Sequence, residues 1–92
     1  MSDGERAGRV EQALVQALAP QQLNITDESH RHAGHAGARG GGHFVVDIVA
    51  EAFRGKSLIE RHRMVHSALD ALMKSGEVHA VSIHAKSPEE LT

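Results

Sequence analysis

The chain has 92 residues, and ten lysines and arginines against twelve aspartates and glutamates give a net charge of −2 with histidine neutral. This balance argues against a generally cationic nucleic-acid binder and against a polybasic membrane anchor. The absence of cysteine excludes disulfides, cysteine-based zinc sites and thiol nucleophiles, and no apolar run reaches the roughly 20 residues that a membrane span needs. We therefore expect a single small domain over residues 1–92, with a cytoplasmic location.

Histidine is unusually abundant, with eight residues in the chain. Protonation of all eight would move the net charge from −2 to +6, so the charge of the molecule depends strongly on pH between about 5 and 7.5. In a chain without cysteine, any metal must be held by histidines, by carboxylates or by the ligands of a partner.

An amphipathic helix is expected over residues 6–18, because Val10, Leu14 and Leu18 recur at a spacing of four. Residues 23–26 alternate between apolar and polar side chains, which is typical of a short strand.

Residues 30–42 contain five glycines, three histidines and no large apolar side chain, which predicts a flexible loop. Residues 43–50 are rich in β-branched and apolar side chains and give the strongest strand signal in the chain. The strands at 23–26 and 43–50 are expected to pair as a hairpin, with the loop as their connection.

A second helix is expected over residues 58–74. Ser57 and Glu60 have the spacing of a capping box, in which the serine hydroxyl accepts from a free amide and the carboxylate reaches back. Gly76 provides the stop signal. The buried stripe of this helix is expected to consist of Leu58, Ile59, Val65, Leu69, Leu72 and Met73.

A third strand is expected over residues 78–85, where alternation places His79 on the same face as Val81 and Ile83. A second capping-box spacing starting at Ser87 predicts a final helical turn. The order α-β-β-α-β-α favours an α+β fold with a three-stranded sheet and helices packed on one face.

The histidines allow two interpretations. His30, His32 and His35 have spacings that metal sites use. The alternative is a flexible polar loop with adventitious affinity for zinc or nickel, and it is favoured over a self-contained metal site because nothing fixes the imidazoles. His79 is either a core histidine with a satisfied hydrogen bond or a functional residue.

A basic segment follows the second strand and consists of Arg54, Lys56, Arg61, His62 and Arg63. Over residues 54–66, four basic residues and one acidic residue give a local charge of +3. Arg61 and Arg63 lie about 200° apart on a helix, so one should project into solvent while the other reaches towards the sheet or a partner. The segment is a solvated helix face, a docking surface for an anionic partner, or a nucleic-acid contact. No aromatic residue lies among these charges, so stacking of single-stranded bases is unsupported.

No catalytic set emerges from the sequence. The carboxylates are scattered, and Ser57 and Ser87 have capping positions. We therefore expect that the protein is not an enzyme and has no small-molecule substrate.

Four groups of residues, in this order, resemble the BolA family. They are Asp27-Glu28-Ser29-His30 with the histidine-rich loop and His43-Phe44; Phe53-x-Gly55-Lys56-Ser57-x-Ile59-x-Arg61-His62-Arg63; Val78-His79-Ala80; and Ser87-Pro88-x-Glu90. The resemblance covers nearly the whole chain and implies a BolA-like fold akin to class II KH domains. It does not carry over the RNA-clamping GxxG loop of true KH domains.

The resemblance also implies a function. Members of this family pair with monothiol glutaredoxins and share a 2Fe–2S cluster that is held together with glutathione, and some have been assigned DNA-binding transcriptional roles. The cluster-ligating histidine of the family maps onto His79, and the second ligand is a histidine or cysteine of the loop between the first two strands. Without cysteine, this chain resembles the His-loop subgroup, with His32 as the first choice of loop ligand and His35 as the second.

The implied role is an adaptor in iron–sulfur cluster handling or iron homeostasis, which binds a monothiol glutaredoxin and holds no stable cluster alone. The alternative is a transcriptional regulator that contacts DNA through residues 54–63. The net charge of −2 counts against this alternative, although a local +3 can still meet phosphates.

Overall fold

The structure is a computed structural model that describes residues 3–28 and 42–91. Its elements, in chain order, are α1 (Asp3–Leu18), β1 (Gln22–Asp27), β2 (Gly42–Val49), the 3-10 turn η3 (Glu51–Phe53), α2 (Leu58–Ala68), α3 (Asp70–Ser75), β3 (Val78–Lys86) and the 3-10 turn η4 (Pro88–Leu91). The predicted loop at 30–42 lies outside the described residues except for Gly42, which is buried at the start of β2.

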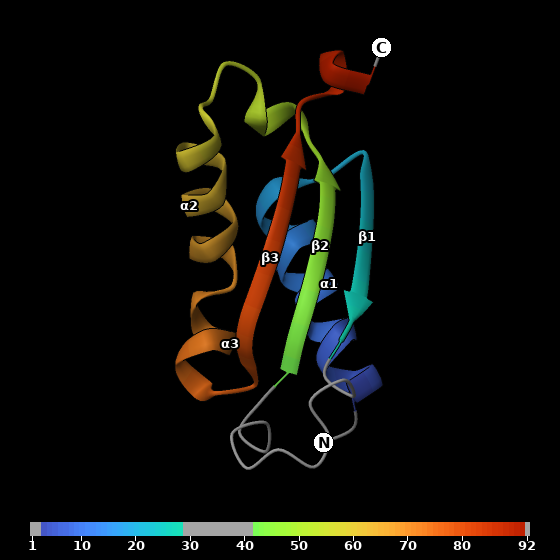
Figure 1. The fold of residues 1–92 in the computed structure, drawn as a ribbon, viewed down its shortest axis with the longest axis vertical. Coiled ribbons are helices and arrows are strands. Elements are labelled where there is room, and N and C mark those ends of the chain that lie inside the picture. The colour runs from blue at the N-terminus through green and yellow to red at the C-terminus, as the bar shows by residue number, and fades with distance from the viewer. Residues whose placement is uncertain (1–2, 29–41, 92) are drawn as a thin grey trace.

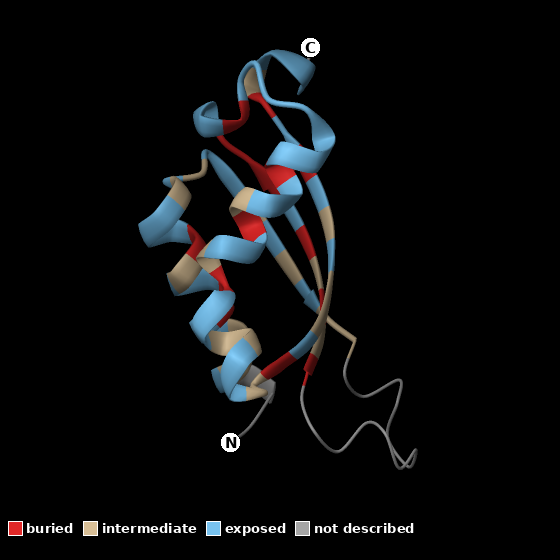
Figure 2. Cartoon of the chain, turned by 90° about the vertical axis from the view of Figure 1, so that its left-hand side faces the viewer, coloured by how far each residue is buried: buried red, intermediate tan, exposed pale blue. Residues whose placement is uncertain are grey.

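The three strands form one mixed sheet in the order β1-β2-β3 (Figure 1). The first two strands are antiparallel, as expected for a hairpin, whereas β2 and β3 are parallel because the chain crosses over through α2 and α3. The α-helices cover one face of the sheet, and no α-helix of the described residues lies on the other face (Figure 2). The predicted α+β architecture is confirmed.

The core lies between the helices and every second residue of the central strand. Phe44, Val46 and Ile48 of β2 are each at most 2% exposed, whereas the residues between them are half-buried or exposed. Burial of each such side chain stabilises the fold by about 1.5–3 kcal/mol. The partners of these residues in the helices and the adjoining segments are Val10, Leu14, Phe53, Val65 and Leu69.

The second predicted helix is divided in two at Leu69. This residue adopts φ −98° and ψ 6°, outside the helical range, while its side chain is fully buried. The change of direction starts α3 at Asp70 and lets Leu72 and Met73 still pack against the core. One continuous helix over residues 58–74 is therefore wrong.

The predicted buried stripe is also wrong at its N-terminal end. Leu58 and Ile59 are each 65% exposed, because they lie in the first turn of α2. The inward position that precedes Val65 by four residues is occupied by Arg61, which is only 7% exposed. A charged side chain thus lies where a hydrophobicity pattern expects an apolar one.

The predicted helix signals are otherwise present. The backbone N–H of Ser57 donates to Glu60 Oε1 over 2.8 Å, and the N–H of Glu60 donates to Ser57 Oγ over 3.2 Å, which completes the capping box. Gly76 ends α3 at φ 86°, a left-handed conformation that favours glycine. At the second predicted box, Ser87 donates to Glu90 through its N–H but does not accept through its hydroxyl, and a 3-10 turn follows.

Candidate functional site

The position of His79 is determined by a bulge at the start of β3. Gly42 of β2 pairs with Val78, but the next residue, His43, pairs with Ala80, so His79 is an extra residue on its strand. A bulge shifts the alternation of side chains. Val78 is therefore buried and His79 is exposed. The prediction that His79 shares the apolar face is wrong, and so is its interpretation as a buried core histidine.

His79 lies next to a second histidine. The ring centroids of His43 and His79 are 5.2 Å apart, with the ring planes inclined by 35°. Each is the second residue of its strand, and parallel neighbours begin at the same edge of a sheet. The sequence interpretation assigned no role to His43. The signal that would have found it is the parallel pairing of the two strands.

Backbone hydrogen bonds hold this edge of the sheet together. The N–H of Glu28 donates to the carbonyl of His43 over 2.8 Å, and the N–H of Gly42 donates to the carbonyl of Glu77 over 3.1 Å. Glu28 and Gly42 are the residues on either side of segment 29–41, so both ends of that segment meet the sheet beside the histidine pair.

The histidine pair does not make a metal site by itself. Within residues 3–28 and 42–91, no group of three histidines, cysteines or carboxylates has the arrangement of a metal site. The predicted loop ligands His30, His32 and His35 lie outside the described residues. Imidazole nitrogen is a suitable ligand for iron, but two imidazoles are fewer ligands than such a centre takes.

Much of the positive charge in the basic segment is matched by carboxylates. Arg54 forms ion pairs with Glu51 over 2.7 Å and with Glu89 over 3.1 Å. The hydrogen bond from the Arg54 guanidinium lowers the pKa of Glu51. Of the predicted contact residues, Arg54, Lys56, His62 and Arg63 are exposed, and only Arg61 is buried.

The Arg61 side chain is buried and stabilises the fold through hydrogen bonds within the chain. Its guanidinium donates to the carbonyl oxygens of Lys56 and Ala85, each over 3.0 Å, and to Glu90 Oε1 over 2.6 Å. The expectation that Arg61 and Arg63 point in different directions is confirmed, with Arg61 directed to the sheet. The prediction that the Arg61 side chain contacts a partner or nucleic acid is therefore wrong, because this side chain is buried.

The same cluster changes the acidity of Glu90. The N–H of Ser87 donates to this carboxylate over 2.7 Å, and together with the Arg61 guanidinium it lowers the pKa of Glu90 to about 2. Arg61, Ser87 and Glu90 all belong to the residues on which the family resemblance rests. In the structure these three motif residues fasten η4 to α2 and β3.

Comparison with known proteins identifies related chains. The family model for BolA-like protein matches residues 14–90. SufE-like protein 1, chloroplastic/mitochondrial, of Arabidopsis thaliana is 44% identical over 94 residues, which cover 96% of this chain and 25% of that protein. BolA-like protein 1 of Mus musculus is 44% identical over 88 residues, which cover 91% of this chain and 62% of that protein. The chain thus spans a quarter to somewhat under two thirds of these curated relatives.

Solved structures agree with the fold. The BolA domain of SufE1 from Arabidopsis thaliana superimposes with a TM-score of 0.81 at 43% identity, covering 95% of this chain and 96% of that one. Among the described residues, no helix is long and apolar enough to cross a membrane. Because one relative is named as chloroplastic/mitochondrial, the cytoplasmic location stays a prediction.

Proposed function

Because this chain belongs to the BolA-like protein family, we propose that it is a non-enzymatic adaptor that binds a monothiol glutaredoxin and shares or receives its 2Fe–2S cluster. The family is linked to iron–sulfur handling. In this proposal His79 is one ligand and a histidine of the loop, His32 before His35, is the second.

The observation that carries the proposal is the exposure of His79 beside His43. A bulge turns the imidazole of His79 out of the core, at an edge where two strands begin side by side. An imidazole exposed on a strand is preorganised for a ligand, because little conformational entropy is lost when the ligand binds.

The loop histidines are connected to the same edge by short lengths of chain. His32 follows Glu28 by four residues, which span at most about 14 Å. The amide of Glu28 is bonded to His43. This length brings His32 within reach of the histidine pair. The preference for His32 over His35 rests on the family resemblance, in which the loop ligand follows Ser29 at this distance. His43, which lies beside His79, is an alternative second ligand that the sequence did not suggest.

A 2Fe–2S cluster needs four protein or thiol ligands. Two histidines from this chain leave two positions for a glutaredoxin cysteine and a glutathione thiol, as the family resemblance implies. The chain alone is therefore expected to bind no stable cluster. When bound, the cluster supplies iron centres whose potential is raised by imidazole ligation; the protein supplies the orientation of His79.

Visible circular dichroism of the cluster tests this proposal. We expect that adding the chain to a glutathione-loaded monothiol glutaredoxin with its 2Fe–2S cluster changes the spectrum and saturates near one equivalent. His79→Ala should abolish or alter the change, and His32→Ala should alter it more than His35→Ala. His66→Ala is the matched control, because His66 is an exposed histidine of α2. An unchanged spectrum with the wild-type chain would rule out cluster sharing.

A further inference from the structure

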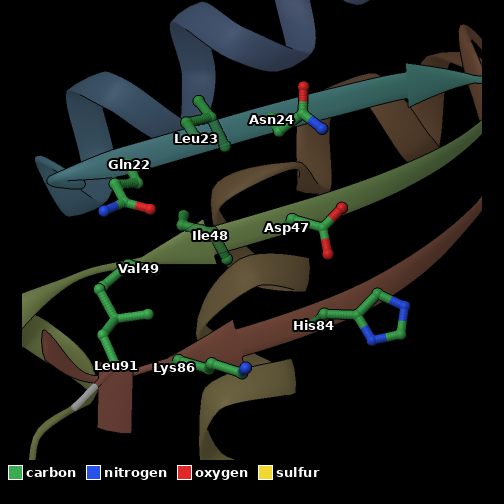
Figure 3. A pocket seen from close by; sticks show the side chains of 9 residues that line it. All are labelled: Gln22, Leu23, Asn24, Asp47, Ile48, Val49, His84, Lys86 and Leu91. Carbon is green, nitrogen blue, oxygen red and sulfur yellow. The ribbon is translucent and has the colours of Figure 1, made fainter. Parts of the chain in front are cut away.

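The face of the sheet that carries no helix holds ligand-type side chains from all three strands. A shallow hollow of about 350 Å³ lies on it (Figure 3). Its lining residues include Gln22, Asn24, Asp47, His84, Lys86 and Leu91. Neither His43 nor His79 lines this hollow.

Strand register aligns three of these side chains in one row. Asp47 of β2 is the partner of His84 in β3 and of Asn24 in β1. Neighbouring strands lie about 4.8 Å apart, and residues in register leave a sheet on the same side. All three residues are exposed, and Figure 3 shows Asp47 and His84 projecting from adjacent strands.

The fold makes no use of Asp47 or His84. Across residues 3–28 and 42–91, neither side chain forms a hydrogen bond or an ion pair, whereas the carboxylates of Glu51, Glu60 and Glu90 all do. A free carboxylate and a free imidazole on adjacent strands are a chelating pair.

We propose that Asp47 and His84 form a site for a borderline divalent cation of the Zn²⁺ type, with the side-chain oxygen of Asn24 as a neighbouring donor. Zn²⁺ takes carboxylate oxygen and imidazole nitrogen at about 2.0–2.2 Å. One ion between side chains that start about 5 Å apart satisfies both distances without moving the strands. The imidazole nitrogen selects Zn²⁺, Ni²⁺ or Cu²⁺ over Mg²⁺ and Ca²⁺.

The affinity of the site is limited by two features. Two protein ligands are fewer than the four of a structural zinc site, so water completes the coordination and the ion exchanges readily. Lys86 is two residues beyond His84 on the same face of β3 and lines the same hollow. Its ammonium repels a cation, so its removal should strengthen binding.

Titration of the full chain with Zn²⁺ alone, followed by NMR of the histidine rings and backbone amides, tests the proposal site by site. We expect the ring of His84 and the amides around Asp47 to shift together and to saturate. When Zn²⁺ binding is measured from the shifts of the amides around Asp47, His84→Gln and Asp47→Asn should each weaken it about tenfold or more. Lys86→Gln should tighten it about two- to threefold, because a like charge is removed.

The variants are interpretable because the side chains of Asp47, His84 and Lys86 are exposed and, within the part of the chain that the structure describes, form no hydrogen bond or ion pair that a substitution would remove. His66→Gln is the control and should leave the amides around Asp47 responding as in the wild-type chain. The proposal is overturned if the His84 ring stays unmoved while other histidines respond, if its shifts do not saturate by millimolar Zn²⁺, or if His84→Gln and Asp47→Asn bind as the wild-type chain does.

Discussion

The guanidinium of Arg61 connects three parts of the chain that are distant in sequence. It donates to the carbonyl of Lys56 before α2, to the carbonyl of Ala85 in β3 and to the carboxylate of Glu90 in η4. Two backbone acceptors and one carboxylate therefore depend on a single buried side chain.

Arg61→Ala should lower the free energy of unfolding by about 2–3 kcal/mol, because it removes charge-assisted hydrogen bonds and takes the guanidinium donor from the buried carbonyl of Ala85. Urea denaturation measures the loss. Arg63→Ala is the matched control: Arg63 is an exposed cation two residues along the same helix, and its removal should cost less than about 0.5 kcal/mol. Equal costs for the two variants would contradict the structural role of Arg61.

Glu90 makes the stability dependent on pH. Its pKa in the folded chain is lowered to about 2 from the ordinary value of 4.5. A lowered pKa means that the stabilisation is fully present above about pH 4.5 and is lost as the pH falls towards 2. Thermal unfolding between pH 6 and 2 measures this effect. The unfolding temperature of the wild-type chain should exceed that of Glu90→Gln at pH 6, and the two temperatures should converge near pH 2.

Glu11→Gln serves as the control for that comparison, since Glu11 is exposed on α1. Its pH profile should follow that of the wild-type chain throughout. A constant gap between wild type and Glu90→Gln down to pH 2 would show that the ionised carboxylate is not the source of the stabilisation.

At the scale of the elements, two glycines differ only in backbone conformation. A Cβ atom added at Gly8 in α1 or at Gly55 before α2 would meet no atom within 4 Å. Gly8 lies within a helix, where alanine is favoured, whereas Gly55 has a φ of +77°, where an L-residue is strained.

Gly8→Ala should therefore raise the free energy of unfolding by about 0.5–1 kcal/mol, and Gly55→Ala should lower it by about 1 kcal/mol or more. Chemical denaturation of both variants measures the two values in one experiment. If both variants shift stability in the same direction, backbone conformation is not what distinguishes the two positions.

The elements were predictable where local signals decide them and not where tertiary contacts do. The strands and α1 follow from periodicity, and the start of α2 follows from the capping spacing of Ser57 and Glu60. The break at Leu69 and the bulge at His79 carry no local sequence signal, because both depend on how the chain packs against the sheet. The bulge matters most, since it alone moves His79 from the core face to the surface.

At the scale of the whole molecule, the histidine pair and the basic segment lie at opposite ends of the sheet. His79 begins β3, while residues 54–63 follow the far end of β2, where α2 starts (Figure 1). Lys86 follows His79 by seven positions along β3, which corresponds to about 23 Å. A partner that binds at the histidine pair contacts the basic segment only if it spans this length.

The charge of the basic end is smaller than the sequence window indicates. Arg54, Lys56, Arg61 and Arg63 are accompanied by Glu51, Glu60, Glu89 and Glu90, so these eight charges sum to zero with histidine neutral, and Lys86 at the end of β3 adds +1. Three of these carboxylates contact Arg54 or Arg61. The pKa of Glu60 is lowered chiefly by its hydrogen bonds with Ser57, and the charges of Lys56 and Arg63 lower it further. The window over residues 54–66 missed the acidic residues that the fold brings from η3 and η4.

Because Arg54 and Arg61 are held in salt bridges, Lys56 and Arg63 are the exposed cations of residues 54–63 that are left for phosphate contacts. Two contacts give a slope of log affinity against log salt of only about −2, and we expect no saturable binding of duplex DNA below about 100 µM at 0.1 M salt. Fluorescence anisotropy at pH 8, where histidine is neutral, measures this directly. Saturable binding with a much steeper slope, lost in Lys56→Ala plus Arg63→Ala, would instead support the DNA-binding alternative. The same loss in Lys74→Ala, whose cation is paired with Asp70 on α3, would place the contact elsewhere on the molecule.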